Sequence, residues 1–157
     1  MMLLKNDEID AMVPRLHRHQ FNDNAVRMTR SLSDAVGMTR IGVHLVHLQP
    51  GHESTEFHYH DSDEEFLYVL SGRGIAEIGN ERFEVGPGDF MGFGAPSKPH
   101  AMRNPFDENL VYLMGGERNV SDVVHYPRIE RTLLKSGGRR AWADWDNLHE
   151  LHRQGKK

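Results

Sequence analysis

FHYHDSDEEFLYVLSG, residues 57–72, is the stretch that decides the fold of this chain. Alternate residues of a β-strand point to the same face, so His58 and His60 are expected to aim their imidazoles at one point. Glu65 opens the next expected strand, directly after an acidic turn. Two imidazoles and a carboxylate in so short a stretch indicate a metal site, because each is a common ligand of divalent ions.

A second stretch, APSKPHAMRNP at residues 95–105, supplies a further imidazole, that of His100. We expect this segment to fold back beside the first one. Imidazole and carboxylate donors together suit zinc, manganese, iron(II), cobalt or nickel, and four such ligands leave coordination positions open for a small molecule. The sequence therefore predicts one divalent metal ion, held by His58, His60, Glu65 and His100.

The two stretches resemble the two conserved motifs of the cupin superfamily. The first motif is matched by Gly51, His58, His60, Glu65 and Gly72, with six residues rather than the usual five between Gly51 and His58. The second is matched by Pro87, Gly88, Asp89, Pro96, His100 and Asn104. The resemblance covers roughly residues 36–115 and implies a small, single-domain, metal-binding member with an all-β, double-stranded β-helix (jelly-roll) barrel.

Hydrophobic alternation and turn signals are typical of short strands from Ala25 to Gly116, with Gly79-Asn80 as a tight hairpin turn between two of them. We predict three parts: an irregular N-terminal arm (1–24), the barrel (25–116) and a C-terminal extension (117–157). Within the extension the strand pattern fades, and the i, i+3 spacing of apolar residues favours a short amphipathic helix. Its apolar residues are Trp142, Trp145, Leu148 and Leu151.

Composition fits one domain with a real core. The chain has 157 residues, a formal net charge of −4 and no cysteine, so disulfides and thiolate ligands are excluded. Interspersed charges argue against nucleic-acid binding, and no apolar run is long enough to cross a membrane. The start lacks the features of a signal peptide, so we expect a cytoplasmic protein. The N-terminal arm is also too short to hold the helix-turn-helix domain that precedes the barrel in many regulatory cupins, which argues against a transcriptional regulator.

Strand alternation also suggests what lies around the metal. If Glu65 and His100 face inward, then Leu67, Val69 and Met102 line an apolar cavity beside them. His47 and Tyr112 are candidate polar groups of the same pocket. A general acid or base is also needed by an enzyme, and none stands out; His47 and Glu53 are the residues to test.

The resemblance leaves the reaction open, since one barrel hosts many activities. We favour a small metal-dependent isomerase, epimerase or lyase acting on an oxygen-rich metabolite such as a sugar or sugar acid. The alternatives are a metal-dependent dioxygenase and a non-catalytic module that binds or senses a small molecule. Apolar residues outside the barrel motifs also predict a homodimer, with residues 1–35 or the C-terminal segment contributing buried surface.

Overall fold

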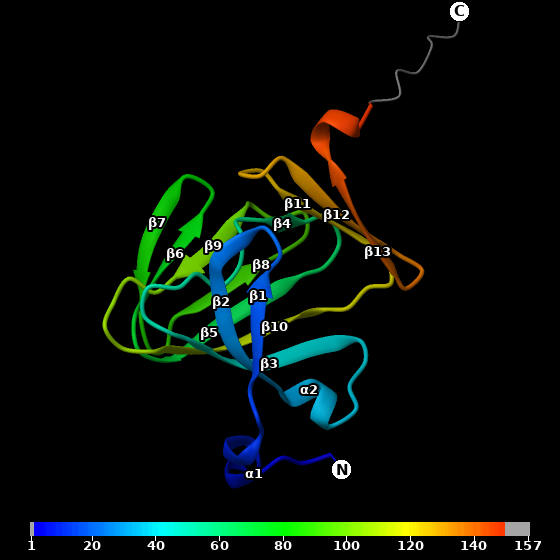
Figure 1. The fold of residues 1–157 in the computed structure, drawn as a ribbon. Coiled ribbons are helices and arrows are strands. Elements are labelled where there is room, and N and C mark those ends of the chain that lie inside the picture. Colours follow the sequence, from blue (N-terminus) through cyan, green and yellow to red (C-terminus); the bar gives the residue numbers. More distant parts are fainter. Residues whose placement is uncertain (1, 150–157) are drawn as a thin grey trace, which may run out of the picture.

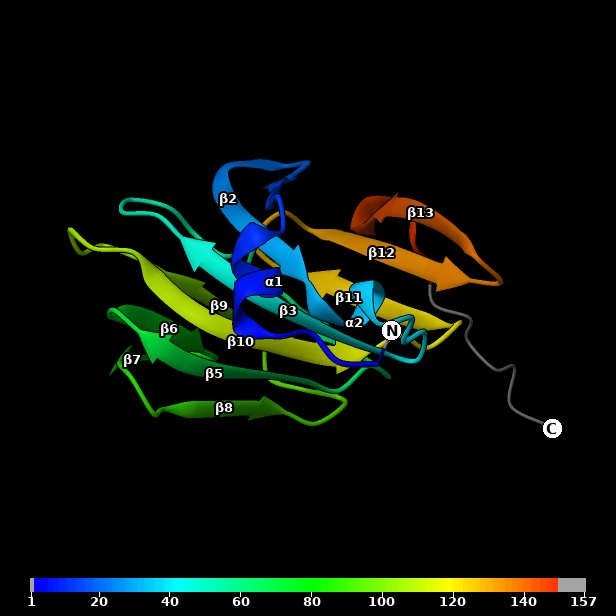
Figure 2. The same cartoon turned by 90° about the horizontal axis from the view of Figure 1, so that it is seen from below.

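Antiparallel strands dominate the computed structural model, which describes residues 2–149. The first layer is a six-stranded sheet in the order β1-β2-β3-β10-β5-β8 (Figures 1 and 2). Its strands are β1 (Arg15–His19), β2 (Asn22–Ser31), β3 (Ile41–Leu48), β5 (Glu65–Ser71), β8 (Phe90–Phe93) and β10 (Leu110–Glu117). The all-β prediction for the barrel region is confirmed.

Two smaller sheets face the first one. One has the order β7-β6-β9 and the other the order β13-β12-β11-β4. Their strands are β4 (Tyr59–His60), β6 (Gly74–Ile78), β7 (Glu81–Val85), β9 (His100–Arg103), β11 (Asp122–Tyr126), β12 (Arg131–Ser136) and β13 (Arg139–Asp144). The two sheets meet where the backbones of His58 and His100 pair, since each donates its N–H to the other's carbonyl, at 3.1 and 2.8 Å.

Helices are short and lie outside the two layers. They are α1 (Asn6–Ala11), α2 (Leu32–Ala35) and the 3₁₀ helix η1 (Trp145–Asn147). In Figure 1, α1 lies near the N-terminus, below the barrel, and α2 lies beside the start of β3. No helix of the described part of the chain is long and apolar enough to span a bilayer.

The core fills the space between the layers. Because strand residues alternate between faces, each inner strand buries every second side chain. Val46, Leu48, Val69 and Tyr112 come from the six-stranded sheet, and all four are 0% exposed. They pack with residues of the facing sheet, such as Met102. The core reaches the histidines, since Phe93, one of its members, stacks on His100.

The chain after Gly116 differs from the prediction. The fading strand pattern there suggested a helix, but β11, β12 and β13 continue the sheet, and Trp142 lies in β13. The predicted helix is therefore wrong at Trp142, and only the 3₁₀ turn at Trp145–Asn147 is helical; Leu151 lies outside the described residues. The missed signal is Gly137-Gly138, whose positive φ angles of 55° and 78° form the two-residue hairpin turn between β12 and β13.

Contacts with the N-terminal arm explain why Trp142 prefers the strand. The arm was expected to be irregular, but it holds α1 and β1, and β1 pairs with β2. The ring of Trp142 lies edge-on to Phe21 at 4.9 Å and contacts His19 and Tyr126. Its Nε1–H donates to Gln20 at 3.1 Å. Tertiary packing of one large aromatic side chain thus outweighs the local helical spacing.

Two barrel turns provide a test of the packing. Gly72 (φ +77°) and Gly88 (φ +94°) both have left-handed backbones, but a Cβ on Gly72 would meet the carbonyl oxygen of Asn109 at 2.2 Å, whereas one on Gly88 would meet nothing within 4 Å. Gly88→Ala should cost roughly 1–2 kcal/mol, from its positive φ alone. Gly72→Ala should lower the free energy of unfolding by more, because backbone cannot move aside easily. Urea denaturation measures both, and equal losses would contradict this account.

Candidate metal centre

The four predicted ligands converge at the open end of the barrel. His60 lies in β4, His58 just before it, Glu65 begins β5 on the opposite layer, and His100 begins β9. The Nε2 atoms of His58, His60 and His100 lie 3.5, 3.4 and 3.3 Å from the same oxygen, Oε2 of Glu65. All three histidines are buried. The sequence spacing therefore does bring these four side chains to one point.

Each imidazole is held by its other ring nitrogen. Nδ1 of His58 faces the carbonyl of Glu56 at 2.9 Å, Nδ1 of His100 faces the carbonyl of Lys98 at 3.1 Å, and Nδ1 of His60 faces Asp122 at 2.7 Å. These partners only accept hydrogen bonds, so each Nδ1 must carry a hydrogen. In the neutral imidazole, Nε2 then presents a lone pair.

Stacked aromatic rings fix the imidazole planes as well. Phe93 lies parallel to His100, with ring centroids 3.6 Å apart and an angle of 4° between the planes. Tyr126 stacks on His58 at 5.7 Å. The ring orientations are therefore set by the fold before any ligand binds.

The electrostatics of the centre favour the forms of Glu65 and His100 that bind metal ions. Burial raises the pKa of Glu65, but contacts with His100 and His58 outweigh it and hold that pKa well below its usual range, so Glu65 is a carboxylate. Burial also lowers the pKa of His100, which favours its neutral form. Carboxylates and neutral imidazoles are the forms of these side chains that bind metal ions. Ligands about 2.1 Å from one ion lie roughly 3.0–3.5 Å apart. The three Nε2–Oε2 distances are in this range, and the donor atoms of His58, Glu65 and His100 also lie within 4.8 Å of one another, so these side chains fit a divalent metal ion.

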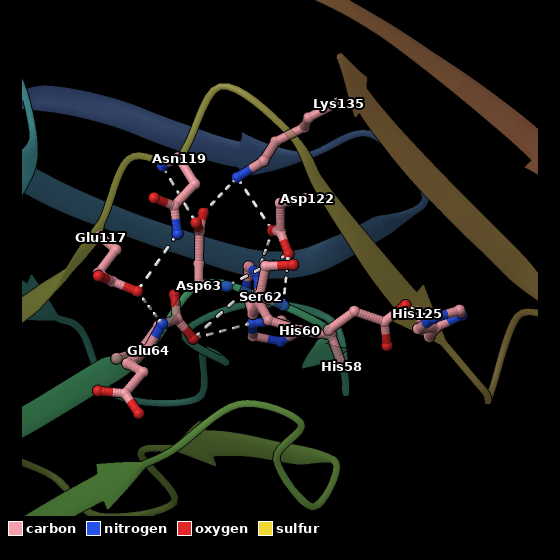
Figure 3. Close-up of polar contacts among 12 residues, drawn as sticks. His58, His60, Ser62, Asp63, Glu64, Glu117, Asn119, Asp122, His125 and Lys135 are labelled. Atoms are coloured by element: carbon pink, nitrogen blue, oxygen red, sulfur yellow. Dashed lines mark hydrogen bonds and ion pairs between the residues drawn. The ribbon is translucent and has the colours of Figure 1, made fainter.

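A buried charge network supports His60 from behind (Figure 3). Oδ2 of Asp122 accepts the His60 Nδ1–H, and Oδ1 accepts the backbone N–H of Ser62 at 3.0 Å. Lys135 donates to Asp122 at 3.0 Å and also to Asp63. Burial raises the pKa of Asp122, but His60 and Lys135 together lower it well below its usual range. Asp122 therefore stays ionised and holds His60 in its Nδ1–H form.

His60, Asp63 and Asp122 also form a second group with metal-ligand chemistry, their donor atoms all within 4.8 Å of one another. The ammonium of Lys135 lies between the two carboxylates and bonds to both. It compensates their charge, so we interpret this group as a support of the first site and not as a second metal site.

Two cavities adjoin the four ligands. An inner chamber of about 120 Å³ is largely apolar and contacts His58, Glu65 and His100. An outer cleft of about 550 Å³ contacts His58, His60 and Glu65 and is lined by polar and cationic side chains. The latter include Arg18, Arg27, Lys135 and Arg140. A ligand can therefore reach the centre through the polar, basic outer cleft and extend into the apolar inner chamber.

The other predicted site residues divide into two groups. Leu67, Met102 and Tyr112 line the inner chamber. Val69 lies in the core, and neither it nor His47 is part of the chamber wall among the described residues. His47 instead lies 3.3 Å from Arg30.

Glu53, the other residue considered as an acid or base, accepts a hydrogen bond from Asn22 at 2.9 Å and lines neither cavity. The sequence prediction missed Asp122, Lys135 and Arg27, which lie outside both motifs. Asp122 is 62 residues from His60 in the sequence, and no local sequence pattern predicts their contact.

Replacing Asp122 tests whether the network acts through the metal site. Asp122→Asn keeps the shape of the side chain but removes the charge that holds His60 Nδ1–H. We expect metal affinity to fall by about 10- to 100-fold with little loss of folded protein. Competition with a coloured chelator measures the affinity. Asp61→Asn is the matched control, because Asp61 is exposed and contacts His125 instead; the same loss in both variants would contradict the assignment.

Comparison with known proteins agrees with the geometry. Residues 44–116 match the family model of the cupin domain. A proposed sugar phosphate isomerase from Acidithiobacillus ferrooxidans is 39% identical, with a TM-score of 0.93 over 97% of each chain. A sugar phosphate isomerase of the cupin superfamily from Silicibacter pomeroyi is 26% identical, with a TM-score of 0.79 over 92% of this chain and 94% of that one.

A shorter match is found with an uncharacterized protein of Methanocaldococcus jannaschii, 40% identical over 55 residues. It spans 35% of this chain and 43% of the length of that relative. The polyketide cyclase of Streptomyces resistomycificus, at 19% identity and a TM-score of 0.61 over 73% of this chain and 80% of its own, shares the fold. With a relative 39% identical over nearly its whole length and a matching domain model, this chain belongs to the cupin superfamily.

Proposed function

We propose that this protein is a metal-dependent isomerase that acts on a phosphorylated sugar. The observation that carries the proposal is the convergence of three Nε2 atoms on Oε2 of Glu65, within 3.3–3.5 Å. His58, His60, His100 and Glu65 would hold one divalent ion. When bound, such an ion polarises a carbonyl oxygen and stabilises the negative charge that develops on it. Zinc, manganese, iron(II), cobalt and nickel all suit this donor set.

The protein around the four ligands orients their side chains and excludes water from one side of the centre. Asp122 and the carbonyls of Glu56 and Lys98 hold the three Nδ1–H groups, so the imidazoles need no rearrangement when a ligand arrives. The inner chamber is walled by apolar side chains. Water is thereby kept from one side of the reacting group, which strengthens every electrostatic interaction there.

The outer cleft supports a phosphorylated substrate. Arg140 comes from β13 and opposes Lys135 on β12. Lys135 is already paired with two carboxylates, whereas no ion pair of Arg140 is found among the described residues. A guanidinium with free donors at the edge of a cleft matches the geometry of a phosphate group. The names of two similar structures, both sugar phosphate isomerases, support the same substrate class.

Assays of a sugar phosphate panel test the proposal. Protein prepared without chelating resin should contain about one equivalent of a divalent metal. It should convert at least one aldose phosphate to the ketose phosphate, as followed by proton NMR with deuterium exchange at the carbon next to the carbonyl. His58→Ala with His60→Ala should lose both the metal and the activity, because two of four ligands are gone.

His52→Ala serves as the control, since His52 lies in the loop after β3 and lines neither cavity. It should retain both metal and activity. Oxygen uptake that depends on substrate, without isomerisation, would instead identify a dioxygenase. A full equivalent of metal in the double variant would overturn the assignment of the ligands.

We also propose that the protein is a homodimer, with the N-terminal residues contributing to the interface. In the monomer, Met2, Leu3, Val13 and Leu16 are 99, 64, 90 and 55% exposed. Exposed apolar side chains gathered on a terminal segment are typical of an interface. Light scattering at micromolar concentration should give about twice the 18.0 kDa chain mass. Deleting residues 2–14 should shift the protein to the monomer, and a wild-type mass near that of one chain would refute the dimer.

A further inference from the structure

Arg27 of β2 lies where three cavities meet. It lines the inner chamber, the outer cleft and a third cavity of about 560 Å³ beneath the N-terminal arm. The third cavity is bounded by Met12, Thr29 and His44, among others. Arg27 is largely buried, and its Nε atom is completely shielded from solvent. The side chain therefore points into the interior of the barrel, on the same side as Glu65.

The guanidinium of Arg27 lacks an anionic partner. Its Nη1 donates to the backbone carbonyl of Ser54, and Nε donates to nothing within residues 2–149. Glu65 attracts it electrostatically without forming an ion pair with it. Tyr112 is in a similar position: it lines the inner chamber, and its hydroxyl is buried and makes no hydrogen bond of good geometry within residues 2–149, with Ser54 as its nearest polar neighbour.

Other arginines of the protein show how unusual this is. Arg128 and Arg82 share the carboxylate of Glu77, each at 2.9 Å, and Arg118 pairs with Asp34 at 2.6 Å. Arg82 and Arg128 are exposed, whereas Arg27 and Arg118 are partly buried, and of these two only Arg118 forms an ion pair within residues 2–149. Burying a charge without a partner is costly, and proteins accept that cost mainly where a ligand completes the site.

Charge balance at the centre indicates which ligand that is. The three histidines are neutral ligands, so one divalent ion, Glu65 and Arg27 together leave a net positive charge in a poorly solvated space. Burial lowers the pKa of Arg27, yet a guanidinium remains charged at neutral pH. Burial raises the pKa of Tyr112 to about 12, and so its hydroxyl remains a hydrogen-bond donor. The site therefore offers hydrogen-bond donors and positive charge without enough negative charge to balance them.

We propose that Arg27 recognises an anionic oxygen at the reacting end of the substrate, with Tyr112 as a second donor in the same chamber, while the phosphate lies in the outer cleft near Arg140. This inference rests on the proposed isomerase function. Arg27 and Arg140 both line the outer cleft, but only Arg27 also lines the inner chamber. The two arginines thus have separate tasks, one for each end of the ligand.

The isomerisation itself explains why charge would develop there. A base removes the proton from the carbon next to the carbonyl; the C–H electron pair forms the C=C bond, and the carbonyl π electrons move to oxygen. The protonated base returns its proton to the former carbonyl carbon, and the hydroxyl proton of the neighbouring carbon passes to the former carbonyl oxygen as the new C=O bond forms at the neighbouring carbon. No oxidant is consumed. Arg27 would bind the enediolate oxygen more tightly than the neutral carbonyl, which favours the transition state.

Binding of three probes to the metal-loaded protein separates the proposed role of Arg27 from that of Arg140. The probes are an aldonohydroxamate, which mimics the planar enediolate, its terminal phosphate ester, and inorganic phosphate. Arg27→Met should weaken the unphosphorylated hydroxamate by at least about 10-fold, since a charged hydrogen bond is lost, and change phosphate binding little. Arg140→Met should weaken the binding of inorganic phosphate and change the affinity for the unphosphorylated hydroxamate little. Arg27→Lys keeps the charge but lacks the planar guanidinium. Its affinity for the hydroxamate should therefore lie between those of the wild type and Arg27→Met.

Calorimetry gives the affinities, and metal content and melting temperature show that each variant is folded and loaded. Arg73→Met is the control, because Arg73 is exposed and pairs with Glu84 outside the cavities. Unchanged hydroxamate affinity in Arg27→Met would overturn the inference; if that variant does not fold, unchanged affinity in Arg27→Lys would do so.

The kinetic outcomes distinguish this inference from the function on which it rests. Isomerase activity that survives in Arg27→Met with wild-type kcat and KM would overturn the role of Arg27 while leaving the isomerase intact. A protein without isomerase activity whose hydroxamate binding still depends on Arg27 would overturn the function and support anion recognition by this residue.

Discussion

The meeting of three imidazoles and one carboxylate is the constraint on which the rest of this structure depends. The fold brings the four groups together: β5 supplies Glu65 from one layer, and the strands around His58 and His100 supply the imidazoles from the other. The hydrogen bonds to each Nδ1, the ring of Phe93 and the charge of Asp122 all serve to hold that geometry. The folded chain thus presents four side chains with metal-ligand chemistry at one place and in fixed orientations.

Much of this could be predicted from sequence because the signals are local. His58 and His60 are two residues apart on a strand, Glu65 follows after one turn, and glycines mark the hairpins. Alternation also placed Leu67 and Met102 beside the ligands, and the structure puts both in the chamber wall. The same parity placed Val69 there, but farther along β5 the wall gives way to the packed core. Alternation predicts which face a residue occupies and not how deep along the strand the cavity extends.

What the sequence did not reveal depends on contacts between distant segments. Asp122 and Lys135 support His60 from strands whose pattern was too weak to recognise, and Arg27 comes from the opposite end of the chain. Trp142 has helical spacing to its neighbours, yet the aromatic rings of the N-terminal arm hold it in a strand. In each case the decisive partner lies many tens of residues away, where neither periodicity nor motif spacing carries information. Gly137-Gly138 was the one local signal that could have corrected the C-terminal prediction.

The seam between the two small sheets has a consequence for dynamics. The paired amides of His58 and His100 are both the joint between β9 and β4 and the backbone beneath two ligands. Any opening of that joint must pull the imidazoles apart, so exchange of these two amide hydrogens with solvent is coupled to occupancy of the centre. Ions that bind more tightly will slow the exchange by the same factor by which they favour the closed form. If the centre holds the proposed metal ion, the exchange rates of these two amide hydrogens would report its affinity without any substrate.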